Sequence, residues 1–508
     1  MATPRATTNV QDQISLDRQR WRFLFFLVLG VALAIGLIAR GTPATGTAIA
    51  FAGLVLTCIA GIAHPFIGVY VIVFVTLVGD AATMTWWPFA KNFSARESIM
   101  FISESMIFSP LEVLMVATAG SWLLQRLEDP TWKFRRGRLL WPVLIFTVFL
   151  CWGFFNGVSR GGDMRTAIFE ARAIFYILII YVLVTNLLTT RRQYQGLLMV
   201  ALVAVSIQSI FVLSYYRGLT PLEREETTDL AQHSATIQMN VLFAFLLALI
   251  LLKGSKRKIW AVLVLAIPVT WAYVLSQRRS AMISLIVGVV MLMIVLWFKR
   301  RRAFWWFTPT VLFFGTGFVL ATWNATGALG LASTSVKSVL FPDQLGAEEE
   351  SSNLYRVIES FDLWFTIRSA PITGRGFGQQ FLMPLPLPDI SFVEFWQFIP
   401  HNSILYMWIK LGFFGFAVMF FMFFRAVQHG GRSTLAVRTG DDVATVFAGA
   451  ASVVMFVVFA YVDIAWDTRS TVFLAVAFAL CADYVLLPET AVQRQPETRA
   501  WPEMLLAK

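Results

Sequence analysis

The stretch HNSILYMWIKLGFFGFAVMFFMFF, residues 401–424, decides the fold class of this chain. From Ser403 to Phe424 it contains one charged side chain, that of Lys410. About twenty apolar residues in a row cross the ~30 Å hydrocarbon core of a bilayer as a helix. Lipid offers no partner for backbone N–H and C=O groups, so an open strand is excluded there. The stretch therefore predicts a transmembrane helix with His401 and Asn402 at a membrane boundary.

Similar apolar runs fill most of the 508 residues. The chain is 57% hydrophobic and 14% charged, with a mean hydropathy of +0.69, whereas a soluble domain carries about 25% charged residues. The fold class that we predict is all-α, a polytopic integral membrane protein with about 12–14 transmembrane helices. The predicted spans are 23–39, 45–63, 66–86, 106–124, 139–157, 173–188, 196–215, 237–252, 259–275, 281–298, 303–322, 403–424, 443–462 and 471–486. The runs 66–86 and 106–124 are the least regular, and each is also compatible with a re-entrant element.

The charge distribution predicts the orientation in the membrane. Arginines at the end of segment 1–22 precede the first span, and no cleavable signal peptide is evident. We therefore predict an uncleaved anchor with a cytoplasmic amino-terminal tail, 1–22. Short basic clusters such as 256–258 and 299–302 then all lie on the inner side, as the positive-inside rule requires. The net charge of +11 is explained by topology and by attraction to anionic membrane lipids, and we expect no nucleic-acid partner.

The same orientation predicts the domain organisation. The order is transmembrane helices over 23–322, one large loop over 323–402 on the periplasmic or extracellular side, carboxy-terminal transmembrane helices over 403–486 and a cytoplasmic tail over 487–508. Within the loop, apolar residues recur at helical spacing over 354–368. This pattern favours an amphipathic helix that lies along the membrane surface, with Arg356 and Glu359 off its apolar stripe.

Several function classes have no support in the sequence. The three cysteines, Cys58, Cys151 and Cys481, lie inside apolar runs without CxxC spacing, which predicts neither disulfides nor a thiolate metal site. Histidines and carboxylates do not form a cluster with ligand spacing, so we expect no metal. A phosphate-binding loop and a strand-borne GxGxxG are also missing from the sequence, so we expect no nucleotide and no other cofactor.

The predicted outer side collects polar residues that suit a phosphate. Arg278 and Arg279 join two spans that have almost no loop between them, Arg356 and Arg375 lie in the long loop, and His401 begins the next span. Arg172 starts the span 173–188 from the same side. The planar guanidinium group binds phosphate oxygens in a bidentate manner, so converging arginines suit a diphosphate. A histidine with a pKa near ~6.5 can accept a proton from an attacking hydroxyl.

Each of these residues also has a structural interpretation. Arg278 and Arg279 can extend to the membrane interface without binding anything. Asn402 can cap the helix that follows His401, Arg375 can support a turn among glycines, and Arg172 can pair with Glu170. His233, in the loop 216–236, has no evident role. Gly412 and Gly415 are the type of residue that allows close helix packing.

At these residues the chain resembles the O-antigen ligase and O-antigen polymerase superfamily of bacterial envelope polysaccharide assembly. The spacing from His401-Asn402 to Gly412 and Gly415 matches the ligase signature of His, Asn/Ser/Gln, nine residues and Gly-x-x-Gly. The segment 275–281, LSQRRSA, resembles the family segment that ends in Ser-Arg-Gly-Ala, with Arg279 on the family arginine, Arg278 as the alternative and serine in place of the family glycine. The segments 353–356 and 371–378 resemble the family loop Arg…Trp…Pro-x-x-Gly-x-Gly-x-Gly, in which Arg375 stands where the family usually has an apolar residue.

The resemblance implies a GT-C-like membrane glycosyltransferase that uses a polyprenyl-diphosphate-linked glycan at the outer face of the inner membrane. It implies that Arg279, Arg278 and Arg356 hold the diphosphate and that His401 is the catalytic base, with Arg375 and Arg172 as secondary candidates. One displacement would invert the anomeric carbon without a metal. The first choice of acceptor is lipid A-core, which makes the protein a ligase. A second lipid-linked glycan as acceptor makes it a polymerase, and a transporter of lipid-linked glycan remains the alternative from another class.

Overall fold

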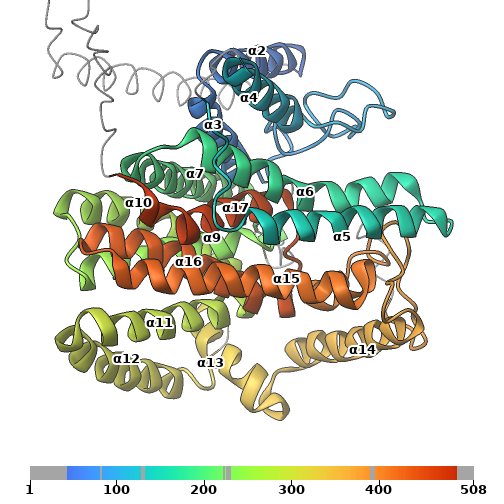
Figure 1. Ribbon diagram of the computed structural model, residues 1–508. Helices are drawn as coiled ribbons and strands as arrows, with labels where there is room; N and C mark the ends of the chain where they lie inside the picture. Colours follow the sequence, from blue (N-terminus) through green and yellow to red (C-terminus); the bar gives the residue numbers. More distant parts are fainter. Residues whose placement is uncertain are drawn as a thin grey trace, which may run out of the picture.

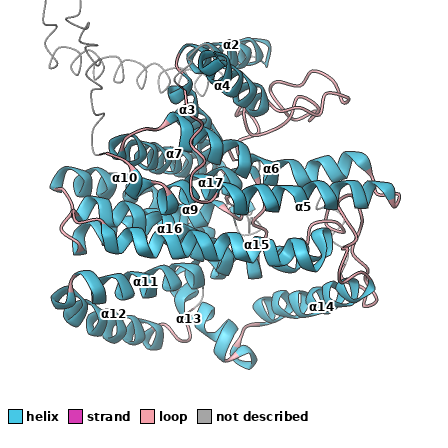
Figure 2. Ribbon diagram, in the orientation of Figure 1, coloured by secondary structure: helices cyan, strands magenta, loops and turns pink. Residues whose placement is uncertain are grey.

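The computed structural model describes residues 43–80, 83–127, 132–220, 223–224, 230–325, 327–388 and 395–488. Within these ranges every regular element is a helix and no strand occurs (Figure 2). The predicted all-α fold class is therefore confirmed. The predicted tail 1–22, the first predicted span, 23–39, and the tail beyond residue 488 lie outside the described residues.

Nine helices of the described ranges are long and apolar enough to cross a membrane. They are α2 (Pro43–Ala63), α5 (Leu140–Ser159), α6 (Met164–Leu187), α7 (Arg191–Gly218), α10 (Lys256–Ser276), α11 (Arg279–Lys299), α12 (Arg301–Ala321), α15 (Ser403–Ala436) and α16 (Gly440–Val462). Three shorter apolar helices are α3 (Pro65–Val78), α9 (Ala235–Leu251) and α17 (Thr468–Ala482). The remaining helices are α4 (Pro110–Leu127), α13 (Gly327–Leu340), α14 (Ala347–Ser369) and the short 3₁₀ turns η1 (Pro342–Gln344) and η2 (Tyr484–Leu486). The protein is a multi-pass membrane protein.

The helices form a bundle with α17 in its interior (Figure 1). All side chains from Arg469 to Ala482 are buried, and α17 packs against α6, α9 and α16. Its many alanines allow neighbouring backbones to approach closely, as is typical of helix contacts in membranes. By contrast, α12 lies at the edge of the bundle, where only Ala303 and Phe307 are buried. The remaining apolar side chains of α12 suit contact with lipid.

Every predicted span within the described residues overlaps a helix, but several boundaries differ from the prediction, and two of these differences have a clear local cause. The run 66–86 is helical only to Val78, because the chain leaves the helix at Asp80, whose buried carboxylate accepts from the Gln232 backbone N–H at 2.9 Å. The helix predicted over 173–188 begins earlier, at Met164, because Asp163 caps it and accepts from the Thr166 N–H at 2.7 Å.

The loop predicted over 323–402 contains more helix than its sequence pattern indicates. The expected amphipathic helix is α14, which ends at Ser369, just before Pro371. An additional helix, α13, covers the Gly/Ser/Thr-rich stretch that begins the loop. The apolar residues Leu354 and Val357 of α14 are exposed, whereas Glu359 is only 1% exposed. The polar side of α14 therefore packs on the protein, and its apolar stripe faces outward.

The stretch 403–424 is helical but does not form one straight span. Gly412 has φ 72° and interrupts the helix α15. Phe423 and Ser403 would lie about 30 Å apart along a continuous helix. Both nevertheless contact Trp466: its Nε1 donates to the Ser403 carbonyl at 2.9 Å, and its ring centroid lies 6.2 Å from that of Phe423. The chain thus turns sharply at Gly412, and the segments 403–411 and 413–436 fold back toward each other.

We predict that Gly412→Ala destabilises the protein. A positive φ costs a non-glycine residue about 1–2 kcal/mol, and a Cβ at this position would lie 2.0 Å from the Ile372 carbonyl oxygen. The melting temperature of the purified full-length protein in detergent should therefore fall. Gly431→Ala is the matched control, because it lies in the same helix and its Cβ would meet nothing within 4 Å. Equal melting temperatures for the two variants would contradict the assigned turn.

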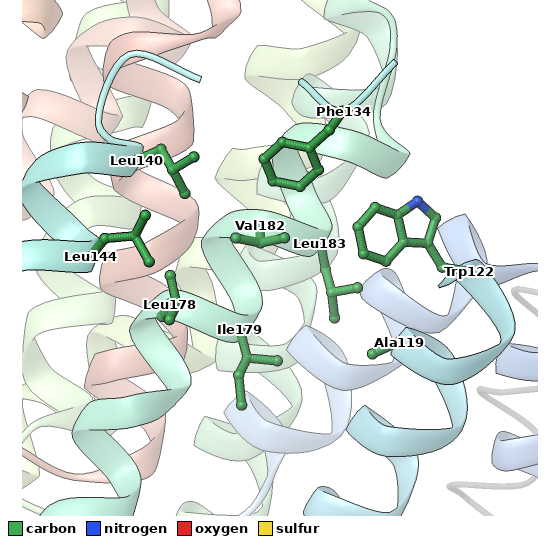
Figure 3. Close-up of a pocket in the computed structure, with 9 residues that line it drawn as sticks. All are labelled: Ala119, Trp122, Phe134, Leu140, Leu144, Leu178, Ile179, Val182 and Leu183. Atoms are coloured by element: carbon green, nitrogen blue, oxygen red, sulfur yellow. The ribbon is translucent and has the colours of Figure 1, made fainter. Parts of the chain in front are cut away.

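An apolar groove of about 410 Å³ opens between α4, α5 and α6 (Figure 3). The side chains drawn in Figure 3 come from these helices and from the segment before α5, and all but the Trp122 indole are pure hydrocarbon. The lining residues are Ala119, Trp122, Phe134, Leu140, Leu144, Leu178, Ile179, Val182 and Leu183. A groove of this composition suits a hydrocarbon chain and offers no group for bond-making chemistry.

Candidate functional site

The turn between α10 and α11 positions the arginine pair. α10 ends at Ser276, Gln277 takes the left-handed conformation with φ 47°, and α11 begins at Arg279. Because the connection is so short, Arg278 and Arg279 lie at the same end of the bundle. The Arg279 guanidinium group donates through Nη1 to Asn353 Oδ1 at 3.3 Å, which ties the start of α11 to α14.

One face of α14 carries three polar residues at a spacing of three. Residues three apart along a helix share a face, and Asn353, Arg356 and Glu359 follow this spacing. Asn353 meets Arg279, and Glu359 meets His401. Arg356, which lies between them, acts electrostatically on the carboxylate of Asp463. The polar face of α14 therefore connects the arginine pair to the histidine.

His401 is oriented by Glu359. Its Nδ1 lies 3.1 Å from Glu359 Oε1, and its backbone N–H donates to the same carboxylate at 3.1 Å. A carboxylate only accepts, so this contact places the ring proton on Nδ1 and leaves the lone pair on Nε2. The Tyr355 ring packs edge-on at 5.5 Å between centroids. The His401 side chain is 27% exposed, so a substrate can reach it.

The predicted capping role of Asn402 is confirmed. Its Oδ1 accepts from the Leu405 N–H at 3.0 Å and caps the first segment of α15. Because Asn402 supplies the cap, the imidazole of His401 is not needed to start the helix. Its ring contacts are instead with Glu359 and Tyr355.

Asp463 is the buried centre of the positive groups. Its Oδ1 lies 2.6 Å from His233 Nδ1, and its Oδ2 lies 3.7 Å from Arg278 Nη1 and accepts from Ser280 Oγ at 2.9 Å. Burial alone would raise the pKa of the Asp463 carboxyl, but the charges of His233, Arg278 and Arg356 outweigh burial and hold that pKa well below its usual range. The Asp463 side chain is therefore a permanent anion that fixes nearby cations.

The Asp463 group and the His401 group belong to one cluster. The Ser403 hydroxyl donates to the Asp463 carbonyl at 3.0 Å and accepts from the Ala465 N–H at 2.9 Å. Only Asn402 separates Ser403 from His401 in the chain. We define the arginine–histidine cluster as six residues from four parts of the chain: Arg278, Arg279, Arg356, Glu359, His401 and Asp463.

Arg375 belongs to a different environment. It lies in the segment 374–378, whose three glycines have positive φ, and a Cβ on Gly376 would lie 2.2 Å from the Gly157 nitrogen. The Arg375 N–H donates to the Ile409 carbonyl at 2.7 Å. The segment is thus packed tightly between α5 and α15. The glycines allow this approach, and the Arg375 backbone lies against Ile409, the chain neighbour of the buried Lys410.

Glu170 pairs with Lys410 and not with Arg172. Lys410 Nζ lies 2.7 Å from Glu170 Oε1, and both side chains are almost fully buried. The Glu170 carboxylate also accepts from the Gly378 N–H at 2.6 Å, which holds the glycine segment against α6. Arg172 donates to the Ile107 carbonyl at 2.8 Å and lies over the Phe169 ring. The alternative in which Arg172 pairs with Glu170 is therefore wrong, because both residues lie within α6 and side chains two residues apart on a helix do not face each other.

Two residues of the site carried no clear signal in the sequence. His233, which has no evident role in the sequence, contacts Asp463 and Arg278. One ring nitrogen of His233 lies 2.6 Å from the carboxylate and 2.7 Å from the guanidinium group, and it cannot donate to one and accept from the other at once. When that nitrogen carries a proton, it donates to the Asp463 carboxylate. When it carries none, it accepts from the Arg278 guanidinium group. Asp463 is a lone acidic residue directly after an apolar run, a pattern too common to indicate a site.

A comparison with protein families gives a match over part of this chain. Residues 264–420 match a family model described as O-antigen ligase. The matched segment contains Arg278, Arg279, Arg356 and His401, whereas Asp463 lies beyond it. No curated protein matches the chain. Over residues 264–420 this protein is therefore similar to the O-antigen ligase family, which supports a membrane glycosyltransferase of the ligase or polymerase type.

Proposed function

We propose that the protein transfers a glycan from a polyprenyl-diphosphate carrier to an acceptor hydroxyl. The acceptor oxygen attacks the anomeric carbon, and the bond from that carbon to the diphosphate oxygen breaks. Polyprenyl diphosphate leaves, and the hydroxyl proton moves to Nε2 of His401. A single displacement of this kind inverts the configuration at the anomeric carbon. The observation that carries the proposal is that one face of α14 links the arginine pair to the Glu359–His401 pair.

The His401–Glu359 pair supports the role of general base. Glu359 fixes the tautomer and stabilises the positive charge that the imidazole ring gains when it takes a proton. General bases of this type contribute roughly 10²–10⁴-fold to rates. Tyr355 also borders the ring, but burial and the nearby Glu359 charge raise the pKa of Tyr355 to about 12. The phenol therefore stays protonated at neutral pH and is the weaker candidate for a base.

The arginines divide into two roles in this proposal. Arg278 faces the buried anion of Asp463, so most of its charge is already balanced and it holds the site together. Arg279 donates to the side chains of Ser352 and Asn353 and is thereby tied to α14, the helix that also carries Arg356. We assign the diphosphate to Arg279 and Arg356, with Arg278 behind them. Guanidinium charges fixed where the leaving diphosphate develops its charge supply electrostatic stabilisation, and the proposed reaction includes no metal or other cofactor.

The proposed location is the periplasmic face of the inner membrane. The arginine–histidine cluster lies at the carboxy-terminal ends of α10 and α16. Lys256 and Gly440 begin these helices at the opposite side of the bundle. The positive-inside rule assigns the basic clusters 256–258 and 299–302 to the cytoplasm. The cluster is then on the outer side, where a lipid-linked glycan meets a lipid A-core acceptor. Lipid A-core is our proposed acceptor, and a second lipid-linked chain would make the enzyme a polymerase.

The size of the product tests this proposal. Purified full-length protein, a polyprenyl-diphosphate-linked glycan and lipid A-core are incubated together, and the products are separated by mass. We expect glycan attached to lipid A-core. A ladder of longer lipid-linked chains would replace the ligase proposal by the polymerase one. Movement of the donor across a vesicle membrane without any new glycosidic bond would show a transporter and overturn the enzyme proposal.

A further inference from the structure

A polar cavity of about 580 Å³ lies at the end of the bundle opposite the arginine–histidine cluster. α16 begins at Gly440 in the wall of this cavity and ends beside Asp463 in the cluster. Arg191, the first residue of α7, and Lys258, in the first turn of α10, also line the cavity. Three helices thus begin around one space. The amino-terminal end of a helix carries a partial positive charge and favours anions.

The charges that line the cavity are not balanced. Four cationic residues face two carboxylates. Asp442 lies 3.4 Å from Arg191, and Asp441 lies 2.9 Å from Lys258. Among the residues that the structure describes, Arg192 and Lys253 have no carboxylate within ion-pair distance. The cavity therefore retains positive charge.

The wall that carries Lys253 is formed by the end of α9 and the start of α16. Lys253 adopts the left-handed conformation with φ 58°, which is uncommon for a residue other than glycine. The adjacent Gly254 N–H donates to the Leu249 carbonyl at 2.7 Å. A Cβ on Gly440 would lie 2.3 Å from the Leu252 carbonyl oxygen, so the start of α16 packs directly on this turn. The left-handed Lys253 and the Gly254–Leu249 hydrogen bond together form a common helix ending, here that of α9.

We propose that this cavity binds the phosphate group of a ligand from the side that the positive-inside rule assigns to the cytoplasm. The two cations without carboxylate partners, Arg192 and Lys253, supply the charge that a phosphate dianion balances. The arginine adds planar donors, which match phosphate oxygens. The cavity is larger than a bare phosphate, so it has room for the group to which the phosphate is attached. Either a lipid headgroup or a soluble compound can present this chemistry.

Hydrogen exchange on the full-length protein in nanodiscs tests the proposal locally. The first probe is inorganic pyrophosphate, added to nanodiscs of phosphatidylcholine. The second is phosphatidic acid, incorporated into the nanodiscs without pyrophosphate. We expect a saturable gain in protection of the amides of 252–258 and 439–443 with at least one probe. Pyrophosphate bound at the arginine–histidine cluster would instead protect 277–281, so the two sites give separate signals.

A charge-matched pair of variants decides the outcome. In the double variant Arg192→Gln/Lys253→Gln we expect the apparent affinity to fall by about tenfold or more, which corresponds to at least ~1.4 kcal/mol. Arg301→Gln/Arg302→Gln is the control, because it removes two exposed charges at another predicted inner boundary. A response to pyrophosphate identifies a soluble source, and a response to phosphatidic acid alone identifies a lipid. Absence of protection with both probes, or an equal loss of affinity in the two double variants, would overturn the proposal.

Discussion

Replacing His401 by alanine should abolish glycan transfer while the protein still inserts and still binds its donor. Nε2 of His401 is the proposed acceptor of the hydroxyl proton, and Glu359 holds the ring in the tautomer that this role requires. Loss of a general base lowers the rate by roughly 10²–10⁴-fold. The diphosphate contacts are assigned to the arginines, so donor affinity should change little. Initial rates of transfer and donor binding, measured on the same preparation, check both parts.

His64→Ala is a suitable control for this experiment. His64 is an exposed residue directly before α3 and makes no side-chain cap of that helix. The same substitution there should leave transfer unchanged. Turnover near the wild-type level in His401→Ala would remove the base assignment. A parallel loss of donor binding would instead show that His401 orders the whole site, through its backbone and ring contacts with Glu359.

The transmembrane helices were predictable because lipid imposes a simple rule on the sequence. A spanning segment must satisfy its own backbone and remain apolar for about twenty residues. The turn at Gly412 was not predictable in this way. It depends on the close approach of the Ile372 carbonyl and on the Phe413 N–H, which donates to the Pro371 carbonyl at 3.0 Å. Hydropathy does not record such contacts between distant segments, so 403–424 was predicted as one span.

The candidate site was predictable only where its residues have a local pattern. The arginine pair between two spans and His401 before an apolar run are visible in the sequence. Asp463 and His233 are single polar residues, and their roles arise from contacts with partners far away in the chain. Arg375 and Arg172 had suitable chemistry but lie in other environments. A residue type can thus identify a candidate, but the packing of the helices decides its neighbours.

Replacing Arg356 by alanine should weaken donor binding more than it changes stability. Arg356 lies half-buried on the polar face of α14, between the residues that contact Arg279 and His401. Hydrogen bonds to charged groups contribute about 1.5–3 kcal/mol, so donor affinity should fall by roughly 10- to 150-fold. Arg356→Lys should recover only part of this loss, because a lysine keeps the charge but lacks the planar donors. Donor titration, with the melting temperature measured in parallel, separates binding from folding.

Arg368→Ala provides the matched control on the same helix. Arg368 is an exposed residue in the last turn of α14, outside the face that meets the arginine pair and His401. If the general positive charge of α14 attracted the donor, both alanine variants would lose affinity alike. If the polar face of α14 binds the diphosphate, only Arg356→Ala should lose it. Equal donor affinity in Arg356→Ala and the wild type would exclude Arg356 from the diphosphate site and leave Arg279 as its principal candidate.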